Sequence, residues 1–317
     1  MFTISNSKLK DWQRCKRLYF YRWKLNLEPK KKNINFIRGT LLHNIVEHRF
    51  NGENPHLPID VLRHEINTTR DEDLLDKKEE IEGVIFTAEL VLAELIKKPA
   101  PMGAIETEYK VECDVNRQVM FEGQVDAFGH IGDGKIAVYE LKSKARPGFD
   151  PVTERFRPQA VLYAEALNQM GHKVTHILRE FIYTPKMNKP ELTKKGAMSR
   201  ANITCTWDFY KSELVRNNLN PEDYLEMKDK LNFKVSESIK TKINPSMTEA
   251  FMNMVAYEAK QMMKETKFVR TWNFNCTMCP FKDACFMGMM DPKSEKAILN
   301  MDFKPRKSHY ANEKEND

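Results

Sequence analysis

The fold is decided by two short runs, Gly123-Gln124-Val125-Asp126 and Ile136-Ala137-Val138-Tyr139-Glu140-Leu141-Lys142. Residues 136–139 are apolar throughout, which is typical of a strand buried on both faces. A carboxylate at the end of such a strand is costly unless it is paired or binds a metal. Glu140 therefore differs from the other Glu-x-Lys tripeptides of this lysine-rich chain, which begin at residues 28, 108, 226 and 258.

The segment between these runs predicts a tight hairpin. Gly132-Asp133-Gly134 fits a three-residue loop with Gly134 in the left-handed conformation, and that register puts Asp126 directly opposite Glu140. Cross-strand neighbours are about 5 Å apart, so both carboxylates could reach one divalent cation, which would relieve their repulsion. Alternation places Lys142 on the same face as Glu140. The alternative is a surface hairpin with an ordinary ion pair.

Around this hairpin the hydrophobic period predicts an α/β core. We expect strands over 105–115, 119–128, 135–142 and 173–183, and helices over 36–50, 74–98 and 154–170. Residues 51–60 are expected to be a loop and 206–268 to be mostly helical. The predicted organisation is an N-terminal helical region (1–100), an α/β core (101–185), a mostly helical region (186–270), a cysteine-rich segment (271–302) and a disordered tail (303–317).

Composition limits the classes of protein that this chain can be. Of its 317 residues, 41% are hydrophobic, which excludes wholesale disorder. Its 51 Lys and Arg exceed its 45 Asp and Glu by six, a mild excess that suits a polyanionic partner. No stretch approaches the ~20 apolar residues of a membrane helix, and the N-terminus lacks a secretion signal. We therefore expect a cytoplasmic protein, of a bacterial cell or a phage-infected host, with no membrane partner and with reduced thiols.

Three of the six cysteines are close together in the sequence. Cys276, Cys279 and Cys285 fall within one short segment, and this spacing indicates a metal site. Cys15 is the candidate for a fourth ligand. Four thiolates suit either Zn²⁺ or an iron–sulfur cluster. Cys113 and Cys205 are expected to be ordinary buried thiols.

With these motifs the sequence resembles the PD-(D/E)XK nuclease superfamily, in particular its RecB-like exonuclease branch with an iron–sulfur cluster. That branch includes AddB-type recombination nuclease domains and CRISPR-adaptation exonucleases. The family pattern is a helical His, then G-x-V-D, E-x-K and Q-x-x-x-Y, and it falls here on His43, Asp126, Glu140 with Lys142, and Gln159 with Tyr163. The resemblance implies a restriction-endonuclease-like core, a mixed central sheet flanked by helices. Its helical N-terminal and C-terminal parts would be joined by a metal cluster.

The resemblance also implies roles for these residues. His43, Asp126, Glu140 and the Leu141 carbonyl oxygen would bind Mg²⁺ or Mn²⁺, and Lys142 would orient the attacking water and stabilise transition-state charge. Gln159 and Tyr163 share one helix face and would help to position Lys142 and the DNA strand. Cys15 with the other three cysteines would hold a structural 4Fe–4S cluster, with Zn²⁺ as the alternative. Taken singly, a helical histidine or tyrosine is more often a packing residue.

Basic residues flank the predicted site. Lys144, Arg146, Arg155 and Arg157 follow Glu140 in the chain and are predicted to contact the DNA backbone, although such charge runs are usually solvated surface. No Walker A sequence is present, so ATP-driven unwinding by that route is excluded. We expect a metal-dependent DNA exonuclease that acts on free ends of single-stranded DNA in recombination, replication or repair. The alternatives are an endonuclease of the same fold and a catalytically silent DNA-binding scaffold.

Overall fold

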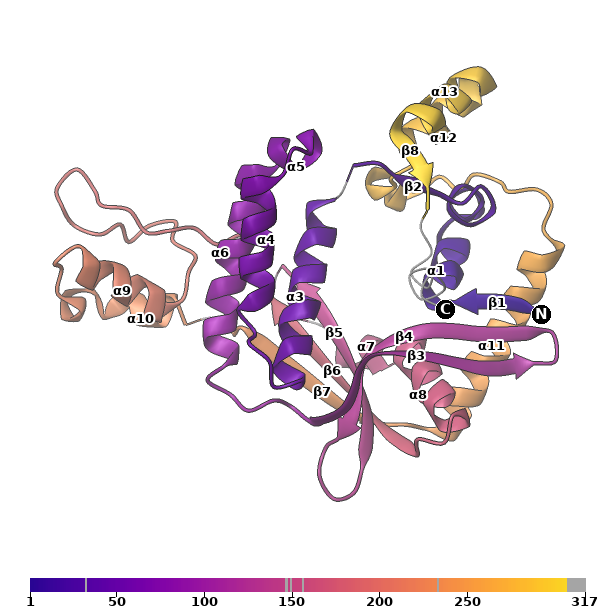
Figure 1. Ribbon diagram of the computed structural model, residues 1–317, viewed down its shortest axis with the longest axis horizontal. Helices are drawn as coiled ribbons and strands as arrows, with labels where there is room; N and C mark the ends of the chain where they lie inside the picture. The colour runs from indigo at the N-terminus through magenta and orange to yellow at the C-terminus, as the bar shows by residue number, and fades with distance from the viewer. Residues whose placement is uncertain (32, 146–147, 149, 156, 233, 307–317) are drawn as a thin grey trace. The chain divides into compact units, whose positions relative to one another are not determined.

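The computed structural model describes residues 1–31, 33–145, 148, 150–155, 157–232 and 234–306 (Figure 1). Two compact units divide the chain, and their segments alternate along the sequence. The first comprises Met1–Lys32, Glu112–Gly123 and Ser246–Asp317, and the second comprises Asn33–Val111 and Gln124–Pro245. The predicted organisation instead had five consecutive segments. The predicted active-site residues belong to the second unit, and the four predicted cluster cysteines belong to the first.

The second unit is built on a mixed sheet. Strands β4 (Val119–His130), β5 (Ile136–Lys144), β6 (Val174–Tyr183) and β7 (Ser236–Lys242) are neighbours in that order, and β3 (Gly103–Asn116) pairs with β4. The residues of β3 and β4 that fall within Glu112–Gly123 belong to the first unit. The β5–β6 pair is parallel, whereas β4–β5 and β6–β7 are antiparallel. The mixed sheet of the prediction is therefore confirmed. The prediction of helix was wrong for β7, where Ile239 is the single large apolar residue, because an edge strand is held by its backbone and keeps polar side chains.

The β4–β5 hairpin has the predicted register. Its pairs run from Ala127↔Tyr139 to His130↔Ile136, and the Ile131 amide donates to the Lys135 carbonyl across the loop. Gly134 has a φ of 65°, in the left-handed region that the prediction required. One step beyond the last pair, this register sets Asp126 across from Glu140.

Helices cover the sheet of the second unit. They are α3 (Ile34–Phe50), α4 (Leu57–Thr68), α5 (Glu72–Asp76), α6 (Lys78–Leu95), α7 (Pro151–Arg155) and α8 (Pro158–Gln169). Leu42 and Val46 of α3 share a core with Tyr139 and Leu141 of β5, while α8 packs against β5 and β6. Strand alternation assigns these contacts to opposite faces of β5. In Figure 1, α3, α4 and α6 form one group beside the strands, and α8 lies apart from it.

Two of these helices differ from the prediction. Helix α4 begins at Leu57, inside the expected loop 51–60, because Pro58 starts a helix as readily as it interrupts one. The helix predicted over 154–170 is two helices, α7 and α8. Arg157 precedes Pro158 and adopts an extended conformation with ψ of 121°, as residues before proline do, so the helix restarts at Pro158.

The insertion between β6 and β7 contains a bridge between Leu192 and Met198, and then α9 (Trp207–Arg216), the 3₁₀ turn η2 (Pro221–Tyr224) and α10 (Glu226–Lys230). Tyr210, Leu214 and Met227 are buried and belong to the same core as Tyr139. The insertion is thus packed onto the second unit.

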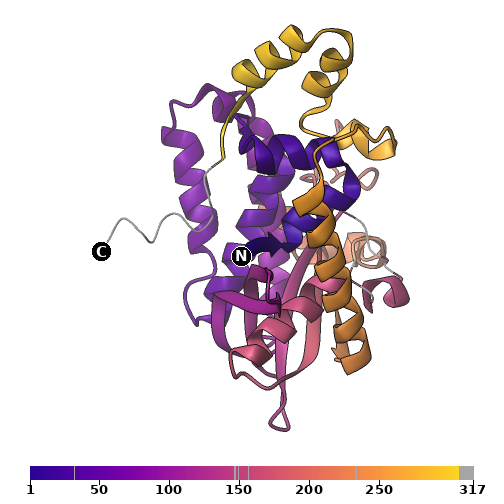
Figure 2. The same ribbon diagram turned by 90° about the vertical axis from the view of Figure 1, so that its right-hand side faces the viewer.

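The first unit is mainly helical. Its elements are β1 (Phe2–Ser5), α1 (Asn6–Arg14), α2 (Lys16–Tyr19), the π-helical turn η1 (Phe20–Lys24), β2 (Leu27–Pro29), α11 (Pro245–Lys264), the 3₁₀ turn η3 (Phe274–Met278), α12 (Lys282–Met290), α13 (Pro292–Asp302) and β8 (Phe303–Pro305). Figure 2 shows α11 along its length and the packed pair α12 and α13. Strand β1 runs parallel to the start of β4.

Strand β8 corrects the predicted disordered tail at its first residues. Residues Phe303–Pro305 pair with β2, and the buried Phe303 ring stacks on Phe281 with centroids 4.4 Å apart. The apolar contact of one phenylalanine orders a segment that is otherwise polar. Residues 307–317 lie outside the described residues. No helix in the described part of the chain is long and apolar enough to cross a membrane.

Candidate active site and cysteine pocket

The candidate active site lies where β4 leaves β5. The ladder between these strands ends at Ala127↔Tyr139, and the next amide of β5 that faces β4, that of Leu141, donates to Asp126 Oδ2 at 2.7 Å. The Asp126 side chain thus accepts the hydrogen bond that a backbone carbonyl would accept in a continuous ladder. This bond fixes the carboxylate beside the end of β5 and leaves Oδ1 for other contacts.

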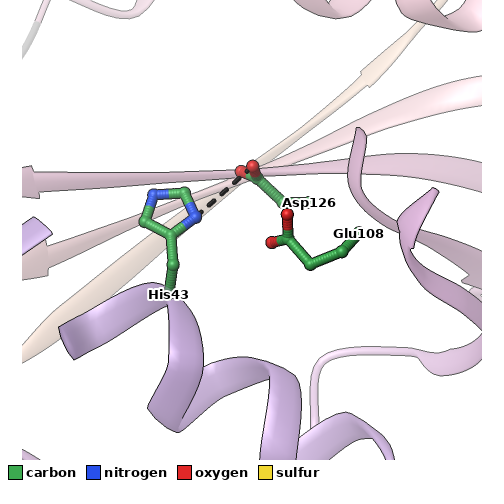
Figure 3. A group of neighbouring side chains, drawn as sticks. All are labelled: His43, Glu108 and Asp126. Carbon is green, nitrogen blue, oxygen red and sulfur yellow. Dashed lines mark ion pairs between the residues drawn. The ribbon is translucent and has the colours of Figure 1, made fainter. Parts of the chain in front are cut away.

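Three ligand-type side chains meet at this point (Figure 3). His43 comes from α3, Glu108 from β3 and Asp126 from β4, and one donor atom of each lies within 4.8 Å of the others. His43 Nδ1 is 3.4 Å from Asp126 Oδ1. Among the described residues, no other group of three His, Cys, Asp or Glu side chains is this close. The structure therefore brings together two of the predicted ligands, His43 and Asp126, with an acid that was not predicted.

The charges of this group influence one another. Burial raises the pKa of Glu108, and the neighbouring Asp126 carboxylate raises it further, to about 7. Burial alone would lower the pKa of His43, but the hydrogen bond and charge of Asp126 outweigh burial and raise it. The protonated imidazole of His43 thus offsets part of the negative charge of the two carboxylates, and a divalent ion would offset more of it.

Glu108 has an unusual backbone conformation. Its φ is +45°, in the left-handed region that a residue with a side chain rarely adopts. The Gln124 side-chain amide donates to the Glu108 carbonyl at 3.1 Å and holds this conformation. Strain of this kind costs about 1–3 kcal/mol and often accompanies functional groups. In the sequence, Glu108 is one of several acids on its strand and begins one of the recurrent Glu-x-Lys tripeptides, so nothing distinguished it.

Glu140 lies outside the three-residue group and has its own partners. Its side chain is 2% exposed, with Oε1 2.8 Å from Lys142 Nζ and Oε2 2.5 Å from Arg179 Nε. These two cations outweigh burial and lower the pKa of Glu140. Apart from this ion pair with Lys142, Oε1 has no partner among the described residues. A buried carboxylate oxygen with one cationic neighbour keeps a lone pair that is chemically suited to a metal cation.

Lys142 is connected to the two residues predicted on α8. Its Nζ donates to Gln159 Oε1 at 3.4 Å, and Gln159 Nε2 donates to the Tyr163 hydroxyl at 3.2 Å. Because Gln159 and Tyr163 are four residues apart on one helix, they face β5 together. This geometry brings Lys142, Gln159 and Tyr163 into one line of contacts beside Glu140.

The donor set fits a hard divalent cation. Two carboxylates and one imidazole are ligands that Mn²⁺ accepts readily, and the carboxylates suit Mg²⁺. That Glu140 and the Leu141 carbonyl oxygen are further ligands of this cation stays a prediction.

Two of the four predicted DNA-contacting residues can be placed. Lys144 Nζ is 3.2 Å from Glu154 Oε1, and Arg157 Nε is 2.7 Å from Glu154 Oε2. Lys144 also lies over the Phe181 ring, 4.2 Å from its centroid. Arg146 lies outside the described residues, as does the side chain of Arg155. Lys144 and Arg157 thus share one acidic partner on α7.

A pocket in the first unit is lined by all four cysteines of the predicted cluster, together with four cationic side chains. Cys15 lies between α1 and α2, Cys276 in η3, Cys279 after it and Cys285 in α12. All four thiols are free, and Arg14, Arg17, Arg270 and Lys282 line the same pocket. Arg17 and Arg270 pair with Glu295, and burial raises the pKa of the Cys279 and Cys285 thiols. Cys113 and Cys205 are buried elsewhere, as predicted for ordinary thiols.

Comparison with known proteins agrees with this geometry at the level of the family. The sequence matches the PD-(D/E)XK nuclease superfamily over residues 3–286, and the chain belongs to that superfamily. No curated protein matches it. Among solved structures, SSO0001 is 14% identical with a TM-score of 0.35, over 88% of this chain and 83% of that one. A protein from Eubacterium rectale named "Putative exonuclease" is 10% identical with a TM-score of 0.37, over 88% and 93% of the two chains.

Proposed function

We propose that this nuclease-superfamily member is a Mg²⁺- or Mn²⁺-dependent deoxyribonuclease that removes nucleotides from free ends of single-stranded DNA. The observation that carries the proposal is the convergence of His43, Glu108 and Asp126, where Asp126 accepts a hydrogen bond from the amide of Leu141, the residue between Glu140 and Lys142. His43, Glu108 and Asp126 would hold the cation, with Glu140 Oε1 and the Leu141 carbonyl oxygen as further ligands. The bound ion would neutralise phosphate charge and lower the pKa of water.

Lys142 supplies the second positive charge in this proposal. Its ammonium group is held between Glu140 and Gln159, so it is positioned before substrate arrives. A fixed cation of this kind stabilises the charge that develops on the phosphoryl oxygens and helps to orient the attacking water. Tyr163 holds Gln159, and through it Lys142.

Lys144 and Arg157 would contact the DNA backbone. Each is a cation held on the second unit, where Lys144 is two residues beyond Lys142 on β5 and Arg157 immediately precedes the helix of Gln159. A DNA strand with one phosphate at Lys142 would therefore run past Lys144 and Arg157. The preference for single strands and free ends, and a role in recombination, replication or repair, rest on the resemblance to RecB-like exonucleases.

The cysteine pocket is proposed to hold a 4Fe–4S cluster with a structural role. Support comes from the four free thiols and the cationic side chains that line one pocket. A cluster held by Cys15 and the C-terminal cysteines would tie together two distant parts of the first unit. Anaerobically purified protein should absorb broadly near ~400 nm. Colourless protein that contains Zn²⁺ would contradict this part of the proposal.

A digestion assay tests the nuclease proposal. With Mn²⁺ or Mg²⁺, wild-type protein should digest linear single-stranded DNA and leave closed circular single-stranded DNA intact. Lys142→Ala and Asp126→Asn should each reduce the rate at least about 100-fold. Lys135→Ala is the matched control, because Lys135 precedes the same strand but pairs with the exposed Asp133.

Each other outcome identifies an alternative. Cutting of the closed circle would indicate an endonuclease of this fold. Wild-type protein that binds DNA but digests no type of end or strand would indicate a catalytically silent scaffold.

A further inference from the structure

A buried arginine holds the acid of the Glu-x-Lys motif. Arg179 on β6 is the direct neighbour of Glu140 in the parallel β5–β6 ladder. Its Nε donates to Glu140 Oε2 at 2.5 Å, and the two side chains are 5% and 2% exposed. An arginine this deeply buried is uncommon and is retained only where its charge is paired.

The far end of Arg179 is held by α7. Its Nη1 donates to the Glu154 backbone carbonyl and is 3.8 Å from Glu154 Oε2. Glu154 is itself 3% exposed. The planar guanidinium group thus lies between two buried carboxylates: its Nε bonds Glu140 on the sheet, and its Nη1 bonds the backbone of Glu154 on the helix and forms an ion pair with that side chain. Such a bridge fixes the direction of the group as well as its position.

The bridge determines which oxygen of Glu140 is available. Arg179 occupies Oε2, so the carboxylate cannot turn without breaking a buried, charge-assisted hydrogen bond. Oε1 then faces Lys142, 2.8 Å from its Nζ, and among the described residues it has no partner other than this ion pair. We propose that Arg179 is a positioning residue, which presents Oε1 of Glu140 to the catalytic cation. The inference rests on the proposed function and adds a residue that acts through Glu140.

Lysine cannot replace arginine in this role. A lysine at position 179 would keep one positive charge but could not reach Glu140 and Glu154 with two nitrogens of a rigid plane. Arg179→Lys is therefore a conservative probe of positioning, whereas a neutral residue would remove the buried charge that faces both carboxylates and threaten folding. Loss of a group that orients a metal ligand typically weakens metal binding 10- to 100-fold, and we expect at least about a tenfold loss here.

The experiment measures Mn²⁺ binding to the full chain by calorimetry, without DNA, and the Mn²⁺ concentration that gives half-maximal digestion. Arg179→Lys should raise the Mn²⁺ dissociation constant and the half-maximal Mn²⁺ concentration at least about tenfold each. Arg22→Lys is the matched control, because Arg22 pairs with the largely buried Asp11 in the first unit and has no link to Glu140. It should leave both constants unchanged.

A double-mutant cycle shows whether Arg179 acts through Glu140. In a Glu140→Gln background, Arg179→Lys should have no further effect on Mn²⁺ affinity. Equal losses in both backgrounds, or reduced stability in urea with an unchanged Mn²⁺ constant, would overturn the proposal. If the wild-type protein binds no Mn²⁺, the proposed function itself fails and the positioning role fails with it. Normal wild-type binding that Arg179→Lys leaves intact removes the positioning role alone.

Discussion

At the scale of single residues, Glu108 and Asp126 place two carboxylates side by side, next to one imidazole. Burial, and next the charge of Asp126, disfavour the ionised form of Glu108 and raise its pKa to about 7. The site is therefore strained electrostatically until a divalent ion binds.

This strain predicts how the stability of the metal-free protein depends on pH. The unfolded chain releases the Glu108 proton near pH 4.5, whereas the folded protein holds it to about pH 7. The native state thus binds more protons in that window, and its stability falls as the pH rises through it. Glu108→Gln should remove this loss and make the metal-free protein more stable at about pH 8, by about 1 kcal/mol after allowance for the partial exposure of Glu108.

Urea unfolding in EDTA, at about pH 4 and about pH 8, checks this expectation. The variant and the wild type should differ at the higher pH and agree at the lower one. A variant less stable than wild type at the higher pH would contradict it. Addition of Mn²⁺ should reverse the order, because the variant lacks one ligand.

Individual site residues could be predicted where a local pattern marks them. Glu140 stood out because it ends an apolar strand, and Lys142 followed from strand alternation. Glu108 and Arg179 could not be found in this way. The position of Glu108 depends on a left-handed backbone that Gln124 stabilises, and the role of Arg179 depends on which strand lies beside β5.

At the scale of elements, the close approach of β3 to β4 depends on Gly129. A Cβ atom at this residue would lie 2.1 Å from the Gly103 carbonyl oxygen, which is backbone and cannot yield easily. The two strands carry Glu108 and Asp126, so this contact also sets the distance between the two carboxylates.

Gly129→Ala should therefore destabilise the protein by about 1–3 kcal/mol and weaken Mn²⁺ binding, since the strands must separate. Gly83→Ala is the control. Gly83 lies in α6 with open space around it, so alanine there should stabilise the helix by about 0.5–1 kcal/mol. Urea unfolding of both variants measures the difference, and a Gly129→Ala protein as stable as wild type would contradict the argument.

The elements that the sequence predicted share a clear hydrophobic period. Strands β5 and β6 have long apolar runs, and the glycines of the β4–β5 loop determine its conformation. Strand β7 and helix α4 were missed for different reasons. Strand β7 is stabilised by pairing with β6 rather than by its own side chains, and α4 begins at a proline within a polar segment.

At the scale of the whole molecule, the two kinds of candidate metal chemistry belong to different units. The cysteine pocket is formed by the first unit, and the carboxylate site is formed by the second. Each unit draws its residues from separated parts of the chain.

Because the two candidate metal sites belong to different units, we expect that the cluster can be lost without loss of Mn²⁺ binding. Cys15→Ser should abolish the absorbance near ~400 nm and lower the melting temperature, because a cluster that closes a long loop stabilises the folded state. Below that temperature the variant should still bind Mn²⁺ with wild-type affinity. Cys205→Ala, which changes a buried thiol outside the pocket, should keep the absorbance. Retained colour in Cys15→Ser would contradict the assignment of this ligand.

The loop that joins β4 to β5 is exposed, and surface loops usually tolerate insertions. This one should not. Because side chains alternate along a strand, one extra residue that shifts the pairing of β4 against β5 would bring Val125 or Ala127 to the place of Asp126. Relatives that keep this chemistry should therefore conserve the number of residues between these two strands, or change it in steps that restore the alignment, even where the loop sequence itself varies freely.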